Sequence, residues 1–300
     1  MKTRIKSALL YGLVFLLLLG LTRFLPYLLS FFLFILLYLS ERELSFLLSE
    51  KEADTFERII SFLQGLSFLI LPLYILFNTN LSNDLLSAYT SKAELGALES
   101  WQLALIFLAW NFLLASLLLA RNLLRLDPQE LPRTCLKIFT NLYLSTALFS
   151  MNFALYTLPF AWEFLCLCFI TPWISDSFAY ICGKSLGKRK ICPRISPNKT
   201  LAGALGSLIV TALSYLLAYI VLREPMHLSK LNIFIVIGIG LLASALCQLG
   251  DLFASGLKRN KGVKDSGELI PGHGGIMDRL DSTYFLFPFM TIIALLIHYI

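Results

Sequence analysis

The sequence has few charged residues and no long polar stretch. Only 15% of its 300 residues are Asp, Glu, Lys or Arg, whereas a soluble globular domain has about 25%. Hydrophobic residues make up 57% of the chain, and its mean hydropathy is +0.75. Apolar runs of about twenty residues recur from one end to the other. These features exclude a soluble enzyme, a secreted disulfide scaffold and a disordered chain, and they indicate a membrane protein.

Cysteine pairs with the spacing of a zinc site are also absent. None of the six cysteines forms a CxxC motif. Cys182 and Cys192 flank one polar loop, but a disulfide there is disfavoured if the loop lies in the reducing cytoplasm. We therefore expect six reduced cysteines without a metal or redox role.

The apolar runs predict an all-α, polytopic integral membrane protein with about nine transmembrane helices. The first run resembles a signal peptide, but no small-residue cleavage site follows it, so we interpret it as a retained span. The spans are expected near residues 8–22, 24–40, 59–77, 101–120, 138–157, 160–181, 201–222, 231–254 and 283–300.

The distribution of Lys and Arg predicts the orientation. If the N-terminus is cytoplasmic, all but four of the 25 Lys and Arg residues lie on the cytoplasmic side. Basic residues concentrate in cytoplasmic loops of membrane proteins. The sequence therefore predicts a multi-pass protein of the cell inner membrane, with its N-terminus in the cytoplasm.

Two regions differ in polar content. Residues 1–157 hold about five predicted spans, and residues 158–300 hold about four. Carboxylates, lysines, glycines and prolines concentrate in 170–210 and 248–282, which contain the predicted cytoplasmic loops 183–200 and 255–282. We expect the active site at the cytoplasmic boundary of the C-terminal half. The acidic stretch 41–58, with Glu41 and Glu43, is expected to be a solvated loop.

One helical face in the C-terminal half carries a carboxylate followed by two cations. Positions three, four and seven apart lie on the same side of a helix. Such a face can hold a metal ion and a phosphate together. Its residues are Gln248, Asp251, Ser255, Lys258 and Arg259.

A second polar group begins the last span. Asp278 and Asp281 are three residues apart and project from the same side of that helix. Carboxylates from two helix ends suit Mg²⁺, which prefers oxygen ligands and shares them with substrate phosphates. The backbone at Gly274 and Gly275 can approach a bound anion closely. His273 is a candidate base, a ribose-hydroxyl acceptor or an ordinary loop histidine, and a base is the least favoured of the three.

Two further positions lie upstream. Asp176 is an ionisable residue inside an apolar span, which favours a functional role. Gly183 and Gly187 do not form a Walker motif, and they are expected to let helices approach closely. Pro197 predicts a helix start that carries Lys199, either as an anion site or as a helix cap with a snorkelling lysine.

The motifs together carry a resemblance. The C-terminal half contains Asp176-x-x-Ala179-Tyr180-x-x-Gly183, Ser196-Pro197-x-Lys199-Thr200, Gln248-x-Gly250-Asp251, Ser255-x-Leu257-Lys258-Arg259, Lys264-Asp265-x-Gly267, Ile270-Pro271-x-His273-Gly274-Gly275-Ile276 and Asp278-Arg279-Leu280-Asp281. This pattern resembles the signature of the phosphatidate cytidylyltransferases, or CDP-diacylglycerol synthases, across roughly the last 130 residues. One departure is Ala202, where family members commonly have an acidic residue.

The resemblance implies a Mg²⁺-dependent nucleotidyltransferase of phospholipid biosynthesis. Its substrates would be CTP and phosphatidate from the cytoplasmic leaflet, its products CDP-diacylglycerol and pyrophosphate, and nucleic acid would have no part. The oligomeric state stays open, a homodimer included. The implied roles are metal binding by Asp251, Asp278 and Asp281, support of the metal by Asp265, phosphate binding by Lys258, Arg259, Lys264 and Arg279, nucleotide contacts by Ser255, Gly274 and Gly275, and further site positions at Asp176, Lys199 and His273.

Two other functions stay open at this point. A CTP-dependent polyprenol or phytol kinase would use a similar cytoplasmic nucleotide site and would transfer the γ-phosphoryl group. An ion-coupled transporter could use Asp176 and Asp251 along its ion path, but it gives no reason for the basic segment 258–279.

Overall fold

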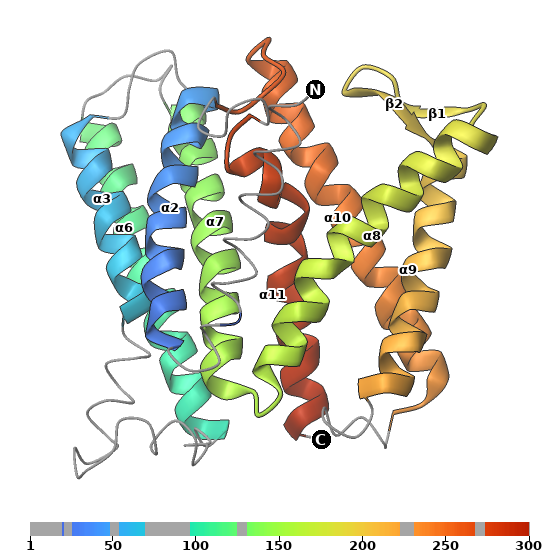
Figure 1. The fold of residues 1–300 in the computed structure, drawn as a ribbon. Helices are drawn as coiled ribbons and strands as arrows, with labels where there is room; N and C mark the ends of the chain where they lie inside the picture. Colours follow the sequence, from blue (N-terminus) through green and yellow to red (C-terminus); the bar gives the residue numbers. More distant parts are fainter. Residues whose placement is uncertain are drawn as a thin grey trace. The chain divides into compact units, whose positions relative to one another are not determined.

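The computed structural model describes Gly20 and residues 26–48, 54–69, 97–124, 131–222, 231–267 and 274–299. Most of these residues are helical, and the strands among them form one short two-stranded hairpin, which confirms the all-α class (Figure 1). They divide into two compact units. Unit 1 comprises the described parts of Met1–Pro159 and of Asp265–Asp278, and unit 2 comprises those of Phe160–Lys264 and Arg279–Ile300.

Unit 1 is built from helices that lie side by side. A polar network inside it joins three of its elements, because Asn152 accepts a hydrogen bond from Ser30 Oγ at 2.7 Å and donates one to the Phe68 carbonyl at 2.8 Å. Buried polar groups are costly without such partners, so the network fixes how these elements pack. The elements are α2 (Pro26–Leu48), α3 (Thr55–Leu66), η1 (Ser67–Leu69), α6 (Ala97–Leu124) and α7 (Leu131–Thr157).

Unit 2 holds a small hairpin between two of its long helices. The strands are antiparallel, with Lys190 opposite Thr200. The expected helix start at Pro197 is wrong, because residues 196–200 form the second strand. The following helix begins at Leu201, where Thr200 Oγ1 accepts the Gly203 N–H at 3.2 Å and caps its first turn. The elements are α8 (Ala161–Leu186), β1 (Lys190–Cys192), β2 (Ser196–Thr200), α9 (Leu201–Leu222), α10 (Ile233–Asn260) and α11 (Met277–Tyr299).

Glycines bring α8 and α9 into close contact, as the sequence predicted. A Cβ added at Gly203 would lie 2.5 Å from the Ala179 carbonyl oxygen, and one at Gly183 would lie 3.6 Å from the Gly203 Cα. No larger residue fits without separating the helices. All six cysteines are free thiols, as expected.

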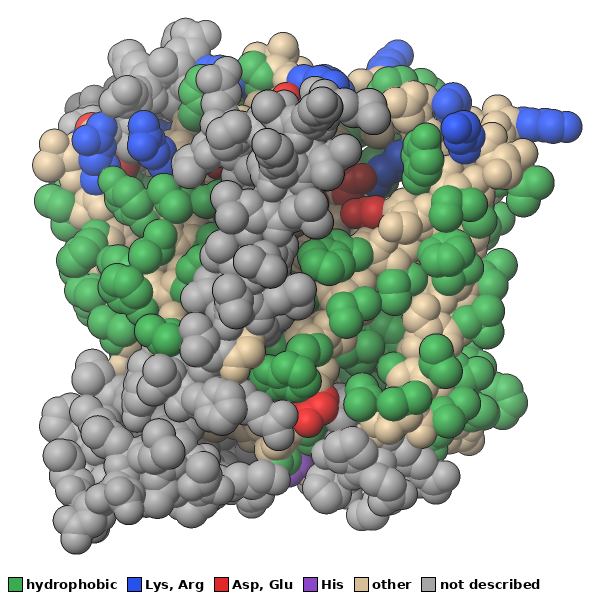
Figure 2. Space-filling view, in the orientation of Figure 1, with side chains coloured by type: hydrophobic (Ala, Val, Ile, Leu, Met, Phe, Trp, Pro, Cys, Tyr) green, Lys and Arg blue, Asp and Glu red, His purple; other side chains and the backbone are tan. Residues whose placement is uncertain are grey.

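Helix α9 of unit 2 has the reverse of the pattern found on a helix of a soluble protein. On α9 the small or polar residues Gly203, Ser207 and Thr211 are buried, while a row of large apolar side chains is exposed on the opposite face. In water this arrangement would be unfavourable, but in lipid small and polar residues mediate helix contacts and leucines face the acyl chains. Figure 2 shows hydrophobic side chains over the flank where α9 lies, and Lys and Arg gathered at the end where β1 and β2 lie. The exposed row is Leu201, Leu205, Ile209, Leu213 and Leu217.

Six helices of the described chain are long and apolar enough to cross a membrane. These helices confirm the character of an integral membrane protein. The first predicted span, apart from Gly20, lies outside the described residues, as does the second half of the third. The six are Trp101–Leu124, Leu131–Thr157, Ala161–Leu186, Leu201–Leu222, Ile233–Asn260 and Met277–His298.

The expectation of a solvated loop over 41–58 is wrong where the structure describes it. Helix α2 continues to Leu48, and α3 already begins at Thr55. Glu41 and Glu43 are only 3% and 5% exposed. Because α2 continues as a helix, both carboxylates lie in the interior of unit 1, where a buried acid is costly unless it has hydrogen-bond partners.

Candidate active site

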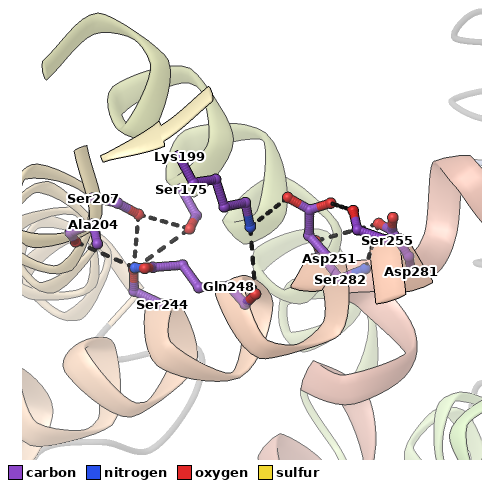
Figure 3. Close-up of polar contacts among 10 residues, drawn as sticks. All are labelled: Ser175, Lys199, Ala204, Ser207, Ser244, Gln248, Asp251, Ser255, Asp281 and Ser282. Atoms are coloured by element: carbon purple, nitrogen blue, oxygen red, sulfur yellow. Dashed lines mark hydrogen bonds and ion pairs between the residues drawn. The ribbon is translucent and has the colours of Figure 1, made fainter. Parts of the chain in front are cut away.

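An ion pair between the hairpin and α10 lies at the centre of the polar residues of unit 2. Lys199 extends from the end of β2, and its Nζ lies 2.5 Å from Asp251 Oδ2 (Figure 3). The same Nζ lies 3.5 Å from the Gln248 carbonyl oxygen. The side chains of Lys199 and Asp251 are 25% and 30% exposed, so water and polar ligands reach both. The pair is therefore accessible and can exchange its partners.

Gly250 brings a second carboxylate to this place. A Cβ added at Gly250 would lie 2.5 Å from the Asp281 carbonyl oxygen and 2.9 Å from the Ser282 Cα, so α10 and α11 touch through their backbones here. Asp251 follows Gly250 directly, and Asp281 interacts with it electrostatically. The glycine thus explains why two acids that are far apart in sequence come together.

Further charged groups join this cluster. Asp281 also interacts electrostatically with Lys258 and Asp176, and Asp176 interacts with Asp251 and Lys199. Three carboxylates in mutual range repel one another and favour bound cations. Asp176 is exposed although it lies inside an apolar helix. We name these five residues, Asp176, Lys199, Asp251, Lys258 and Asp281, the unit 2 acid–lysine cluster.

The donor set of this cluster suits a hard cation. Its oxygens are already partly engaged, since Asp251 Oδ1 accepts from Ser255 Oγ at 3.3 Å and Asp281 Oδ1 accepts from the Ser282 N–H at 2.7 Å. No three Asp, Glu, His or Cys side chains among the described residues form a ready metal cage. Mg²⁺ commonly takes only one or two protein carboxylates, with water and substrate phosphates as its other ligands. The chemistry of these carboxylates is therefore compatible with a hard cation that takes its other ligands from water or a bound phosphate.

Three buried serines lie behind the ion pair. Ser207 Oγ is 2.8 Å from Ser175 Oγ and 2.9 Å from Ser244 Oγ, so one hydroxyl each from α8, α9 and α10 meet (Figure 3). The Gln248 side-chain amide donates to the Ala204 carbonyl and to Ser244 Oγ, both at 3.3 Å. This network fixes the turn of α10 whose carbonyl faces Lys199. The meeting of these three hydroxyls was not predicted from the sequence, although three small polar residues in adjacent spans are a signal for such a contact.

The basic residues after the cluster have different surroundings. Arg259 is exposed, and its guanidinium donates to the carbonyls of Ile195 at 3.3 Å and Val263 at 3.2 Å, which ties the hairpin turn to the end of α10. Lys264 and Arg279 belong to unit 2 and are exposed. His273 lies outside the described residues.

The other predicted site residues lie in unit 1, at the start of α11. Asp278 Oδ2 accepts three hydrogen bonds, from the Ser266 N–H at 2.7 Å, Ser266 Oγ at 2.8 Å and the Gly275 N–H at 2.9 Å. Gly274 has a φ of +81°, and a Cβ there would lie 2.6 Å from Asp278 Oδ2. The glycines thus accommodate a carboxylate of the protein itself. Asp265 is exposed at the beginning of this segment.

A buried acid of α2 completes this arrangement. Glu43 Oε1 accepts the Ile276 N–H at 2.8 Å, and Glu43 Oε2 accepts the Met277 N–H at 2.9 Å. Ser266 Oγ lies 3.0 Å from Glu43 Oε2. Glu43 was not predicted as a site residue from the sequence, because it lies 222 residues before Asp265 and belongs to no motif.

Comparisons with known proteins agree with these motifs. The model of the cytidylyltransferase family matches residues 2–297. Phosphatidate cytidylyltransferase of Staphylococcus aureus (strain COL) is 42% identical over 138 residues, which are 44% of this chain and 49% of that protein. The enzymes of the same name from Staphylococcus haemolyticus (strain JCSC1435) and Staphylococcus epidermidis (strain ATCC 12228 / FDA PCI 1200) are 42% and 40% identical over 133 residues, with the same coverage. The chain thus spans about half the length of the curated relatives it matches. Because the family model covers nearly every residue, the chain belongs to the cytidylyltransferase family.

Proposed function

We propose that the protein is a phosphatidate cytidylyltransferase, which transfers the cytidylyl group of CTP to phosphatidate and yields CDP-diacylglycerol and pyrophosphate for phospholipid biosynthesis. The observation that carries the proposal is the unit 2 acid–lysine cluster, with an accessible Lys199–Asp251 pair, in a chain of the cytidylyltransferase family. The names of its relatives support the same reaction.

Catalysis of this reaction depends mainly on positioning the two substrates and neutralising the charge of their phosphates. A phosphatidate oxygen attacks the α-phosphorus of CTP, and pyrophosphate leaves in line. Lys199 would leave Asp251 and contact a phosphate oxygen, because an ammonium group at the accessible edge can exchange one anion for another. The other cations proposed to bind the triphosphate or the lipid phosphate are Lys258, Arg259, Lys264 and Arg279.

Mg²⁺ is proposed to be held by Asp251, Asp278 and Asp281, with Asp265 in support. When bound, the ion would polarise the attacked phosphate and neutralise the leaving pyrophosphate. Asp176 adds negative charge beside Asp251 and Lys199. The three hydrogen bonds on Asp278 Oδ2 orient this carboxylate, as is usual for acids that bind metals. Nucleotide contacts are proposed for Ser255, Gly274, Gly275 and His273.

The surrounding spans are proposed to hold the second substrate. The exposed apolar face of α9 suits acyl chains of the bilayer, while the phosphate of phosphatidate reaches the charged end of unit 2. In this proposal the protein has about nine spans, lies in the inner membrane with a cytoplasmic N-terminus, and has its site at the cytoplasmic boundary.

The test is product analysis with purified protein in mixed micelles that contain phosphatidate and Mg²⁺. CTP labelled at the α-phosphate should label CDP-diacylglycerol, and CTP labelled at the γ-phosphate should release labelled pyrophosphate. Asp251→Asn is expected to abolish both while Gly256→Ala, on an open part of α10, retains them. Transfer of the γ-label to a lipid alcohol with release of CDP would instead indicate a kinase. Ion flux without CTP would indicate a transporter.

A further inference from the structure

The first turn of α11 is held by a carboxylate from a distant helix. A helix N-terminus leaves backbone N–H groups without partners inside the helix, and it attracts negative charge. Glu43 accepts two of these groups, from Ile276 at 2.8 Å and Met277 at 2.9 Å, one on each carboxylate oxygen. Glu43 is 5% exposed, so water contributes little to satisfying this carboxylate. Its burial is therefore compensated by the start of α11.

Ser266 connects Glu43 to Asp278. The Ser266 hydroxyl lies 3.0 Å from Glu43 Oε2 and 2.8 Å from Asp278 Oδ2, and the Ser266 N–H also donates to Asp278 Oδ2 at 2.7 Å. A serine hydroxyl has one proton, so the two carboxylates share a single O–H donor. Any displacement of Glu43 therefore changes the hydrogen bonding of Asp278.

The glycine at position 275 supports the same role. A Cβ at Gly275 would overlap the Glu43 carboxylate and lie 2.5 Å from Ser266 Oγ. A Cβ at Gly267 would lie 3.1 Å from Glu43 Oε1. Gly267 and Gly275 thus both leave room for the Glu43 carboxylate. Residues 265–267 and 274–278 therefore fit closely around Glu43.

We propose that Glu43 is a positioning residue of the reaction: it fixes the start of α11 and, through Ser266, the carboxylate of Asp278. This inference rests on the proposed function, in which Asp278 binds the metal. Glu43 itself touches neither substrate. It acts by holding Asp278 in one orientation before the nucleotide binds.

The test compares Glu43→Gln with Glu41→Gln in the full-length protein in detergent micelles. Glu41 is a matched control, because it is buried on the same helix but faces Ser61 and accepts neither of the two N–H groups at the start of α11 that Glu43 holds. The first measurement is amide hydrogen exchange without CTP or Mg²⁺. Glu43→Gln should speed exchange at Ile276 and Met277 about ten- to hundred-fold, because a glutamine keeps one acceptor oxygen and loses the charge. In Glu43→Gln, amide exchange in α8 and α9 should stay unchanged. In Glu41→Gln, exchange should stay unchanged in α8, in α9 and at Ile276 and Met277.

The second measurement is CDP-diacylglycerol formation. Glu43→Gln should lower kcat about ten- to hundred-fold and change the KM for CTP less than about threefold, since orientation of Asp278 matters most in the transition state. Glu43→Asp, which keeps the charge on a shorter side chain, should recover part of kcat. If Glu43→Gln does not fold, Ser266→Ala takes its place in the kcat measurement, because it removes the hydroxyl that links Glu43 to Asp278.

The outcomes separate the two proposals. If exchange at Ile276 and Met277 becomes faster in Glu43→Gln but the wild type forms no CDP-diacylglycerol, the contact of Glu43 with α11 stands and the proposed function is refuted. An active wild type with unchanged exchange and kcat in the variant would overturn the role of Glu43. Faster exchange throughout unit 1 and unit 2 would also overturn it, because Glu43 would then serve general stability only.

Discussion

Replacing Lys199 by methionine should separate catalysis from stability. Methionine has a similar length and no charge, so the substitution removes the ion pair with Asp251 and little packing. Both side chains are a quarter or more exposed, and exposed pairs of this kind contribute about 0–1 kcal/mol to stability. The unfolding temperature should therefore change little.

The effect on the reaction should be much larger. If Lys199 moves to a phosphate oxygen, its charge stabilises the negative charge that develops in the transition state. Loss of one such group costs about 3–4 kcal/mol, which is about 10²–10³ in kcat. Lys199→Arg keeps the charge but not the compact ammonium group, so we expect an intermediate rate.

The assay measures pyrophosphate release and thermal unfolding on the same purified samples. Lys199→Met should lose activity while its unfolding temperature stays close to that of the wild type. Gly256→Ala is the matched control, since outside the adjacent backbone of α10 no atom of the described residues lies within 4 Å of the added methyl group. Full activity in Lys199→Met would refute the reasoning. So would an activity loss that only follows the loss of folded protein.

Three more predictions concern the contacts of α10 and of the segment before α11, and the metal. Gly250→Ala should destabilise the protein by about 1–3 kcal/mol in thermal unfolding, because its Cβ meets the backbone of α11. The control Gly256→Ala should be neutral or stabilising by up to about 1 kcal/mol. Equal effects of the two substitutions would contradict the close contact of α10 and α11. Gly274→Ala should reduce activity more than Gly262→Ala, since both have positive φ but only the Cβ at Gly274 meets a carboxylate; equal activities would show that backbone strain alone matters. EDTA should stop pyrophosphate release and Mg²⁺ should restore it, and activity that survives complete chelation would remove the metal from the proposal.

The sequence predicted the helices of unit 2 well, because long apolar runs leave few alternatives to a helix in lipid. Spans 201–222 and 231–254 correspond closely to α9 and α10. It failed at residues 196–200, where Pro197 was interpreted as a helix start. The hairpin there depends on contacts with distant residues, such as the hydrogen bond from Arg259 to the Ile195 carbonyl, and a local pattern does not reveal them.

The site was predictable to the extent that its chemistry is local. The face with Asp251, Ser255 and Lys258 follows from helical spacing, and the hydrogen bond from Ser255 to Asp251 confirms it. The burial of Glu43 was not predictable, because a Glu-Arg-Glu stretch after an apolar run is typical of a solvated helix end. Only tertiary structure shows that its charge faces the amides of another helix.

The signature motifs between Ser255 and Asp281 have to meet two requirements, accessible charge and close packing, and these requirements favour different residues. Their charged members, such as Lys258 and Asp281, lie around the accessible pair of Lys199 and Asp251, where they can exchange partners. Their small members in unit 1 pack against Glu43 and Asp278 and leave no room for a larger side chain. Substitution of an acid can therefore abolish activity either by removing a charge near the accessible pair or by disturbing the packing in unit 1. For Asp278, whose Oδ2 accepts three hydrogen bonds, loss of activity in Asp278→Asn does not by itself identify a metal ligand. The same substitution at Asp251, which accepts only side-chain partners in the described structure, tests the chemistry more directly.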